Sequence, residues 1–535
     1  MNQDEDGRVN AVAARPDRPG GEAMQRWLMK RQWWWAVVWF AVCGSVLGGP
    51  PATAAERSKD DVVVAFGLLG PSLDPQIQFA VPIYALVRHI FDPLVEFDAQ
   101  NTIGPKLAES WRLAEPTAWE FKLRKGVKFH NGEPFTANSV KFTLERVVKP
   151  ETKSPQAFIF AWLDRVDVPD PYTAVIRTKG PYRPILSILA VTEMLDAKAA
   201  ADPAAHGLKP VGTGAFKFVE FLPNSRVVLV RNEDYWGPKP KFKNLTFREI
   251  RDNSTRVASL ETGETDVIHN PPPEDIPRLN ANPKLEVKSI PSSRAMGVYL
   301  NTRKTKPLQD IRVRQALNHA VDKEALIRFI LKGMTTPLKG PMTEEVSFFN
   351  PNLKPYAYNP ELAKKLLAEA GYPNGFSIAF GHPTGRWVLD KEIPEAVAAQ
   401  LAKVGIKATL TTLEWGTYIA DYTAWRRGEG KFDVLLGGWG TITYDADWAL
   451  WNNFHTPNPF GLANAEVDKL LEQGRGAFDL KEADAVYRKA QEQIWTEAPW
   501  IWLFKHPEIT GVNKRLKNFA PRVNEYIMVR DAWVE

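Results

Sequence analysis

The stretch from residue 105 to 144 constrains the fold more than any other part of the sequence. It reads PKLAESWRLAEPTAWEFKLRKGVKFHNGEPFTANSVKFTL. Apolar and charged residues alternate over 119–124, which predicts a half-buried strand. Asn131-Gly132 predicts a tight turn, and Thr136 is suited to cap a helix whose apolar residues recur at three- and four-residue spacing. The stretch therefore predicts a strand, a turn and an amphipathic helix in close succession.

The same stretch closely resembles the signature region of the bacterial family 5 extracellular solute-binding proteins, whose pattern is roughly P-x-LAESW, a strand, then F-x-LR-x-GVKFH-x-G-x-P-x-T-A-x-x-V. Two later segments support the resemblance: 209–218 is similar to the family's PVGTGPYKF, and 232–237 is similar to its NPDYWG. A generic hairpin followed by a helix would explain the stretch alone. It would not explain the near position-for-position match.

The resemblance implies an α/β fold, namely a two-lobed periplasmic binding protein of class II, of the large peptide-binder type with an extra subdomain. A chain of 535 residues is also too long for one hydrophobic core. We expect the first lobe to combine 56–290 with 501–535 and to carry the subdomain at about 78–185. The second lobe is expected to span 291–500.

Residues 1–55 are predicted to be an N-terminal extension and a cleavable signal peptide. Basic residues precede an apolar run at 33–47, and small residues follow at 52–55. The run is shorter than the roughly 20 residues that span a bilayer, although a membrane anchor is the alternative. Met24 could be the true start. The only cysteine, Cys43, lies in this segment, so the mature chain is expected to lack disulfides and thiolate metal sites.

Three strands are expected in the second lobe, at 376–380, 406–413 and 432–436, separated by helices at 393–404 and 415–425. This alternation predicts a parallel sheet. Ligands of open α/β sheets bind outside the carboxyl ends of the strands. The loops that follow these strands are therefore the predicted binding site.

The candidate ligand-binding residues in these loops are aromatic, acidic or basic: Trp439, Asp445, Asp447, Tyr444, Trp415, Tyr418 and Arg386. The guanidinium of Arg386 suits a ligand carboxylate, and the glycines at 437, 438 and 440 would let the backbone approach a ligand. Each residue also has a structural alternative. The tryptophan at 439 could fill the core between the lobes, Asp445 could cap the next helix, Trp415 and Tyr418 could pack at a helix start, and Arg386 could be solvated.

In peptide receptors of the family, the third loop carries an aspartate three residues after its tryptophan, and this aspartate pairs with the α-ammonium of the ligand. Here the tryptophan is Trp439 and the residue three positions on is Ile442, so the chain departs from the pattern. The spacing from Asp445 to His455 resembles the glutathione-type branch.

The resemblance implies the periplasmic substrate-binding component of an ATP-binding cassette importer. It would capture a small peptide-like solute by hinge closure and deliver it to inner-membrane permease subunits. An oligosaccharide receptor and a nickel-chelate receptor are alternatives, the first because tryptophan is abundant. A hydrolase that uses Asp445 and Asp447 is a further alternative, but the sequence has no Gly-x-Ser-x-Gly or His-Glu-x-x-His motif.

We further expect a monomer without catalytic residues, a cofactor or a metal site. The net charge of +5 is spread along the chain without a basic block, so no nucleic-acid partner is expected.

Overall fold

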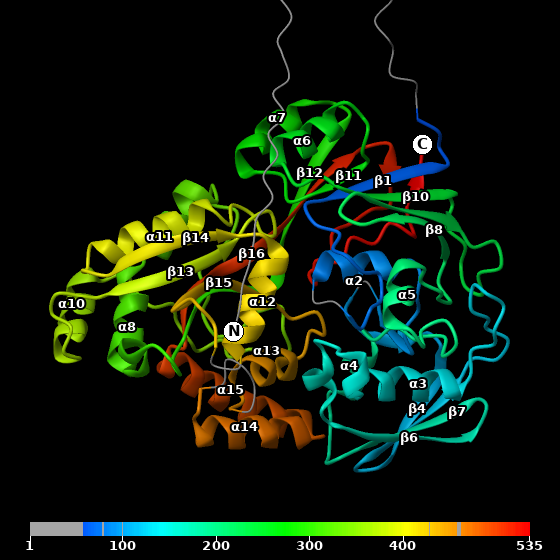
Figure 1. The fold of residues 1–535 in the computed structure, drawn as a ribbon, viewed down its shortest axis with the longest axis horizontal. Coiled ribbons are helices and arrows are strands. Elements are labelled where there is room, and N and C mark those ends of the chain that lie inside the picture. The colour runs from blue at the N-terminus through cyan, green and yellow to red at the C-terminus, as the bar shows by residue number, and fades with distance from the viewer. Residues whose placement is uncertain (1–56, 78–79, 99, 427–428, 457–461) are drawn as a thin grey trace, which may run out of the picture. The chain divides into compact units, whose positions relative to one another are not determined.

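The long strands β12 (Leu285–Leu300) and β16 (Trp500–Asn513) run side by side through the centre of the structure, which is a computed structural model (Figure 1). The structure describes residues 57–77, 80–98, 100–426, 429–456 and 462–535. The predicted signal segment lies outside them. Strand β16 is buried over most of its length and β12 is buried from Ser292 to Leu300, as expected for strands covered on both faces.

The two central strands belong to a ten-stranded sheet of order β14-β13-β15-β12-β16-β11-β1-β10-β9-β8. Beyond β16 the strands are β11 (Val267–His269), β1 (Asp61–Phe66), β10 (Asn244–Glu249), β9 (Arg226–Arg231) and β8 (Phe216–Leu222). Both neighbours of β1 run parallel to it. Helix α6 (Asn253–Glu261) connects β10 to β11.

The three strands predicted in the second lobe lie on the other side of β12. They are β13 (Ser377–Pro383), β14 (Lys407–Leu413) and β15 (Val434–Gly440), linked by helices α11 (Glu392–Ala402) and α12 (Trp415–Arg426). Strand β13 pairs in parallel with both β14 and β15. The predicted parallel arrangement is therefore confirmed, and the carboxyl ends of the three strands meet at one edge.

The glycine-rich segment after the third strand was expected to be a loop, and this expectation is wrong. Residues 437–440 continue β15 and pair with β12. A Cβ at Gly437 would lie 2.3 Å from the Tyr299 ring, and a Cβ at Gly438 would lie 2.3 Å from the Met296 sulfur. At these two positions the glycines make room for side chains of the neighbouring strand.

The stretch 105–144 contributes two strands and a helix to a unit with a separate four-stranded sheet, of order β4-β5-β7-β6. The members are β4 (Ala108–Glu115), β5 (Ala118–Leu123), β7 (Thr173–Thr178), β6 (Leu163–Asp170) and α3 (Ala137–Val148). Phe121 and Leu123 are buried on one face of β5, which confirms the predicted half-buried strand. Gly132 has a φ of 90° in the predicted turn.

The remaining strands and helices complete the described part of the chain. They are β2 (Val95–Phe97), β3 (Ile103–Pro105), β17 (Leu516–Lys517), β18 (Trp533–Val534), α2 (Val81–Val87), α4 (Ile185–Leu189), α5 (Pro203–Leu208), α7 (Ile276–Ala281), α8 (Ile311–Ala320), α9 (Lys323–Ala325), α10 (Pro360–Glu369), α13 (Ala446–Phe454), α14 (Ala465–Gly476) and α15 (Leu480–Glu497).

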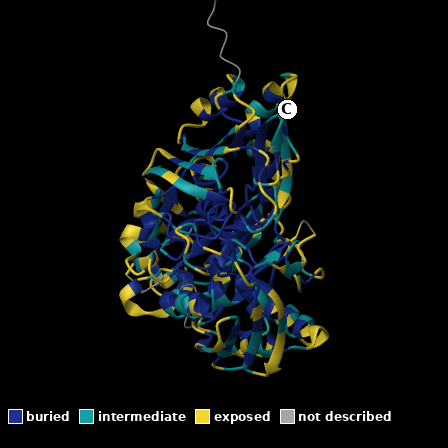
Figure 2. Ribbon diagram, turned by 90° about the vertical axis from the view of Figure 1, so that its right-hand side faces the viewer, coloured by how far each residue is buried: buried dark blue, intermediate teal, exposed yellow. Residues whose placement is uncertain are grey.

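Buried residues fill the interior of the region Ser58–Glu535, and exposed residues lie at its periphery (Figure 2). Trp495, Trp500 and Trp502 stack in this core, with ring centroids 5.0–5.1 Å from that of Trp502. In the described part of the chain, no helix has the length and apolar character needed to span a bilayer.

The lobe boundaries stay a prediction, because Ser58–Glu535 forms one compact unit. The pairing of β12 with β16 is nevertheless irregular between Pro291 and Ala295, close to the expected boundary at 290. Such an irregularity bends a strand locally.

Candidate functional site

A cavity lies where the carboxyl ends of β13, β14 and β15 approach helix α2. Its volume is about 60 Å³, well below the roughly 300–1,000 Å³ of ordinary small-molecule sites. Its lining is mostly aromatic and apolar: Val81, Tyr84, Arg294, Tyr299, Arg386, Trp387, Trp415, Tyr418, Ile419, Tyr422, Gly438, Trp439, Gly440, Ile442 and Trp448. In composition, this lining is that of a site for a small solute.

Stacked aromatic rings form one wall of the cavity along helix α12. Trp415 and Tyr418 are nearly parallel with centroids 5.2 Å apart, and Tyr422 continues the stack at 6.1 Å. The three residues follow one another at three- and four-residue spacing, which places them on one helix face. Tyr418 also donates a hydrogen bond of 2.9 Å to the Leu436 carbonyl, which ties the helix to β15.

The opposite wall is formed by Trp439 at the end of β15 and Trp448 on α13, whose ring centroids are 6.1 Å apart. The indole of Trp439 donates to the Trp448 carbonyl, and the indole of Trp448 donates to the Gly440 carbonyl. Each ring is thus fixed by a hydrogen bond from its indole N–H to a backbone carbonyl.

Arg386 is the charged group of the cavity that has no counter-charge in contact. It is 5% exposed, and its Nε and Nη1 atoms have no hydrogen-bond partner among the described residues. Its guanidinium lies 5.5 Å from the Trp387 ring and 5.7 Å from the Trp415 ring. Burial, together with the nearby Arg294, lowers the pKa of Arg386 to about 9. The side chain is therefore a buried cation at neutral pH and not a solvated loop arginine.

The loop that carries Arg386 is held in place by Asp390. Its carboxylate accepts hydrogen bonds from the backbone N–H groups of Gly385, Arg386 and Trp387 at 2.8–3.1 Å. Because the carboxylate of Asp390 accepts these three backbone hydrogen bonds, it fixes the loop and does not pair with the Arg386 guanidinium.

The second arginine of the cavity, Arg294, is neutralised by Glu525. Its Nε and Nη2 atoms each lie 2.7 Å from a different oxygen of that carboxylate. Although burial opposes ionisation of Glu525, the Arg294 guanidinium holds its pKa well below the usual range. Arg294 also donates to the Gly438 carbonyl.

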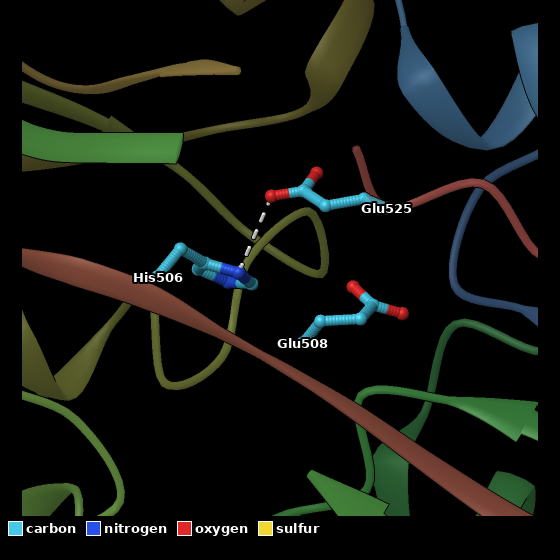
Figure 3. A group of neighbouring side chains, drawn as sticks. All are labelled: His506, Glu508 and Glu525. Atoms are coloured by element: carbon cyan, nitrogen blue, oxygen red, sulfur yellow. Dashed lines mark ion pairs between the residues drawn. The ribbon is translucent and has the colours of Figure 1, made fainter. Parts of the chain in front are cut away.

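A buried group of three side chains, one of which contacts Arg294, has a geometry that could hold a metal ion: His506, Glu508 and Glu525 (Figure 3). Both oxygens of Glu525 already bind Arg294, and Glu508 lies 3.2 Å from His269 Nε2. Burial lowers the pKa of His506 to about 3, so this ring is neutral. Arg294 and His269 therefore already engage the two carboxylates, and the cluster does not offer a free donor set.

The two acidic candidates lie outside the cavity lining, and each binds an arginine. Asp445 receives two hydrogen bonds of 2.7 and 2.8 Å from Arg183. It also caps α13 by accepting from the Asp447 backbone N–H. Asp447 receives two hydrogen bonds of 2.9 Å from Arg475. The helix-capping alternative for Asp445 is thus the observed arrangement.

Tyr444, the remaining candidate, also lies outside the lining residues. It has a φ of 55°, and its hydroxyl accepts a hydrogen bond from the Asn524 backbone N–H at 3.2 Å. Its ring packs edge-on against Phe97. Tyr444 therefore joins three segments that are distant in the sequence.

Comparison with known proteins identifies the class of this chain. A family model described as bacterial extracellular solute-binding proteins, family 5 middle, matches residues 102–461. The chain belongs to this family. The predicted family 5 resemblance is thereby confirmed, and the role of the molecule is to bind a solute.

Among family 5 relatives, the glutathione-binding protein GsiB of Pectobacterium atrosepticum is 31% identical over 512 residues, which cover 92% of this chain and 98% of that protein. This likeness confirms the predicted glutathione-type branch. The Escherichia coli GsiB is 32% identical over 484 residues, covering 88% of this chain and 93% of that protein.

A solved structure supports the fold class. The ABC transporter-associated periplasmic binding protein DppA from Helicobacter pylori, in complex with the peptide STSA, superimposes with a TM-score of 0.81 at 28% identity. The superposition covers 89% of this chain and 98% of DppA. The predicted two-lobed α/β class is confirmed.

The sequence predicted only some of the residues that line the cavity. Arg386, Trp415, Tyr418 and Trp439 were expected and do line one space. The cavity also includes Tyr84, Tyr299 and Arg294, which were not expected. Strand β12 and helix α2 contribute them, and no local pattern in the sequence marks these residues as neighbours of the loops after β13 and β15.

Proposed function

We propose that this protein is the periplasmic receptor of an ATP-binding cassette importer and that it captures a small peptide-like solute carrying a carboxylate. The observation that carries the proposal is Arg386, a buried cation with unpaired N–H groups in an aromatic cavity. A bidentate guanidinium–carboxylate pair would satisfy both the charge and the free donors. The names of the GsiB and DppA relatives support the peptide-like class and the importer.

The proposed solute contacts are Arg386, Trp415, Tyr418 and Trp439. The aromatic rings would cover the body of the solute and exclude water, which strengthens the ion pair at Arg386. Asp445, Asp447 and Tyr444 are not retained as contacts, because their polar atoms bind other parts of the protein.

Hinge closure is the proposed mechanism, with 56–290 plus 501–535 as one lobe and 291–500 as the other. Val81 and Tyr84 of α2 come from the first of these ranges, whereas the remaining lining residues come from the second. A solute that touches both sides would favour the closed form, which inner-membrane permease subunits would recognise. The irregular pairing at 291–295 is the proposed hinge.

We infer that the protein has no hydrolytic activity and acts as a monomeric receptor, secreted through a cleavable signal at 1–55. The carboxylates of Asp445 and Asp447 are bound to arginines and lie outside the cavity, so the pair does not offer a general acid and base. Binding and release of a solute needs no cofactor in this subunit.

The test begins with the solute that co-purifies with the protein, identified by mass spectrometry. Purified protein, freed of solute by unfolding and refolding, is then titrated calorimetrically with glutathione, short peptides, a nickel–histidine chelate and neutral oligosaccharides. Saturable binding of one carboxylate solute without product formation is expected. Binding restricted to neutral sugars or to the nickel chelate, or turnover of a bound compound, would contradict the proposal.

A further inference from the structure

The charges that line the cavity restrict the chemistry of its solute. Among the described lining residues there are two arginines and no aspartate or glutamate. Arg294 is neutralised by Glu525, whereas Arg386 has no contacting carboxylate. The cavity therefore carries an uncompensated positive charge, which favours an anion and opposes a second cation.

Four of the carboxylates around the cavity are engaged by other groups of the protein. Asp390 binds three backbone N–H groups, and Glu525 binds both ends of the Arg294 fork. Asp445 and Asp447 each form a two-point ion pair with an arginine. None of these four is available to pair with an ammonium group of a solute without losing an existing partner.

The backbone acceptors at the end of β15 are also engaged. The Gly438 carbonyl accepts from Arg294, and the Gly440 carbonyl accepts from the Trp448 indole at 3.0 Å. An ammonium group needs three acceptors once it leaves water. These two carbonyls are therefore not free to supply them.

Aromatic faces can also bind a cation, but Arg386 already uses two of them. Its guanidinium lies within 6 Å of the Trp387 and Trp415 rings, which is the range of a cation–π contact. The side chain of Ile442, 3% exposed, lines the same space without a polar atom.

A short peptide cannot place its two charges in different environments here. A dipeptide spans about 7 Å, so a carboxylate bound to Arg386 leaves the α-ammonium inside or at the mouth of the same cavity. There the ammonium would face a guanidinium, aromatic rings and Ile442 in place of an acid.

We propose that the solute of this receptor carries a carboxylate but no ammonium group, as in a peptide whose amino end is acylated or closed into a lactam. This inference rests on the proposed function, since it assumes that Arg386 binds the solute, and it narrows the peptide-like class to members with a blocked amine.

The test compares matched pairs that differ only in the amine, using refolded full-length protein and calorimetric titration. The pairs are glutamate with pyroglutamate, Gly-Phe with acetyl-Gly-Phe, and glutathione with glutathione acetylated on its amino group. We expect the blocked member of at least one pair to bind, and to bind at least tenfold more tightly than its free-amine partner. Arg386→Met is expected to abolish that binding.

The variant Ile442→Asp tests whether the cavity can gain affinity for an ammonium group, because it adds a carboxylate to the lining. We expect this variant to reduce the ratio of the two affinities, blocked member over free-amine member, by at least threefold. The wild-type comparison decides alone if this variant does not fold, as judged by circular dichroism.

The outcomes separate the two proposals. A free-amine peptide that binds as tightly as its blocked partner overturns the inference and leaves the receptor function standing. A panel in which no carboxylate of either kind binds, and a co-purifying solute without a carboxylate, overturns both. A co-purifying solute with a carboxylate and no amine supports both.

Discussion

Arg386 and Asp445 show how the same degree of burial has different consequences for two charged side chains. Asp445 is 7% exposed, forms an ion pair with Arg183 and caps the start of α13. Arg386 is 5% exposed and has buried N–H groups without a partner. A buried charge without a partner destabilises the folded state. This difference is the reason why we propose Arg386, and not Asp445, as the solute contact.

We predict that Arg386→Gln stabilises the solute-free protein while weakening the receptor. Replacing an unpaired buried cation by a neutral amide should raise the free energy of unfolding by about 1–3 kcal/mol. Loss of the charge-assisted hydrogen bonds should weaken carboxylate binding by about 2 kcal/mol, roughly thirtyfold. Urea unfolding and calorimetric titration measure the two effects.

The matched control is Arg294→Gln in the same cavity. This change leaves Glu525 buried without its partner, so the free energy of unfolding should fall by about 3–5 kcal/mol. Equal destabilisation by both substitutions would show that Arg386 is paired in the solute-free protein.

At the scale of elements, the glycine-rich end of β15 and the start of α13 are organised by partners far along the chain. Gly437 and Gly438 admit Tyr299 and Met296 of β12, while Arg183, which precedes α4, reaches Asp445 at the start of α13. The Arg183 guanidinium also lies 4.7 Å from the Phe348 ring. The third loop is therefore held from several sides, which positions Trp439 beside the cavity.

The ion pair between Arg183 and Asp445 should show strong coupling in a double-mutant cycle. The side chains are 11% and 10% exposed, so removing Arg183 with Arg183→Met should destabilise the protein by about 3 kcal/mol. The added change Asp445→Asn keeps the helix cap and removes the stranded charge, so much of the loss should be recovered. Urea unfolding of the single and double variants measures the coupling.

The surface pair Arg165 and Asp164 provides the comparison for this cycle. Its side chains are 55% and 47% exposed, and exposed pairs contribute about 0–1 kcal/mol. At the surface pair, the losses of unfolding free energy in the two single variants should add in the double variant. The same additivity at Arg183 and Asp445 would contradict a strong buried interaction.

At the scale of the whole molecule, the strands β12 and β16 connect the two predicted lobes, and the cavity lies between α2 and the tips of β13–β15. With the proposed hinge, solute binding would be coupled to the angle between these predicted lobes. We predict that the radius of gyration measured by small-angle X-ray scattering decreases when a bound carboxylate solute saturates the protein. With Arg386→Gln the same solute concentration should leave the scattering unchanged, and identical dimensions for the wild-type protein would rule out hinge closure.

Acid should destabilise the molecule through buried neutral histidines, of which His89 is one. Its Nδ1–H donates to the Ala85 carbonyl, and its Nε2 accepts from the Val529 N–H, so the ring joins α2 to the C-terminal segment as a neutral group. Burial, with Arg530 nearby, lowers the pKa of His89 to about 3.

The folded pKa of His89 lies below the value of about 6.5 in an unfolded chain. Its contribution to stability is therefore full above pH 6.5 and is lost as the pH falls towards 3, with a slope of about 1.4 kcal/mol per pH unit. His89→Gln should reduce the slope of unfolding free energy against pH in this window. The same change at the partly exposed His319 is the control, and equal slopes for wild type and His89→Gln would contradict the assignment.

Local patterns were sufficient to predict much of this protein. Alternating residues predicted β5, and the succession of strands and helices between 376 and 436 predicted the parallel strands β13–β15. The rule that ligands bind at carboxyl ends then led to Arg386, just beyond the end of β13, and to Trp439, at the end of β15. The family was recognisable from the stretch 105–144 because a motif of consecutive residues can be read without knowledge of the fold.

Only the tertiary structure decided which charges are free. Asp445 looked as available as Arg386 in the sequence, but its partner Arg183 lies 262 residues away. The cavity likewise gains Tyr84 and Arg294 from elements distant in the chain. Hydrogen bonds and burial depend on where packed elements meet, and this meeting is set by the whole fold. For that reason the sequence determined the class and the site loops, whereas the packing determined that the site is cationic.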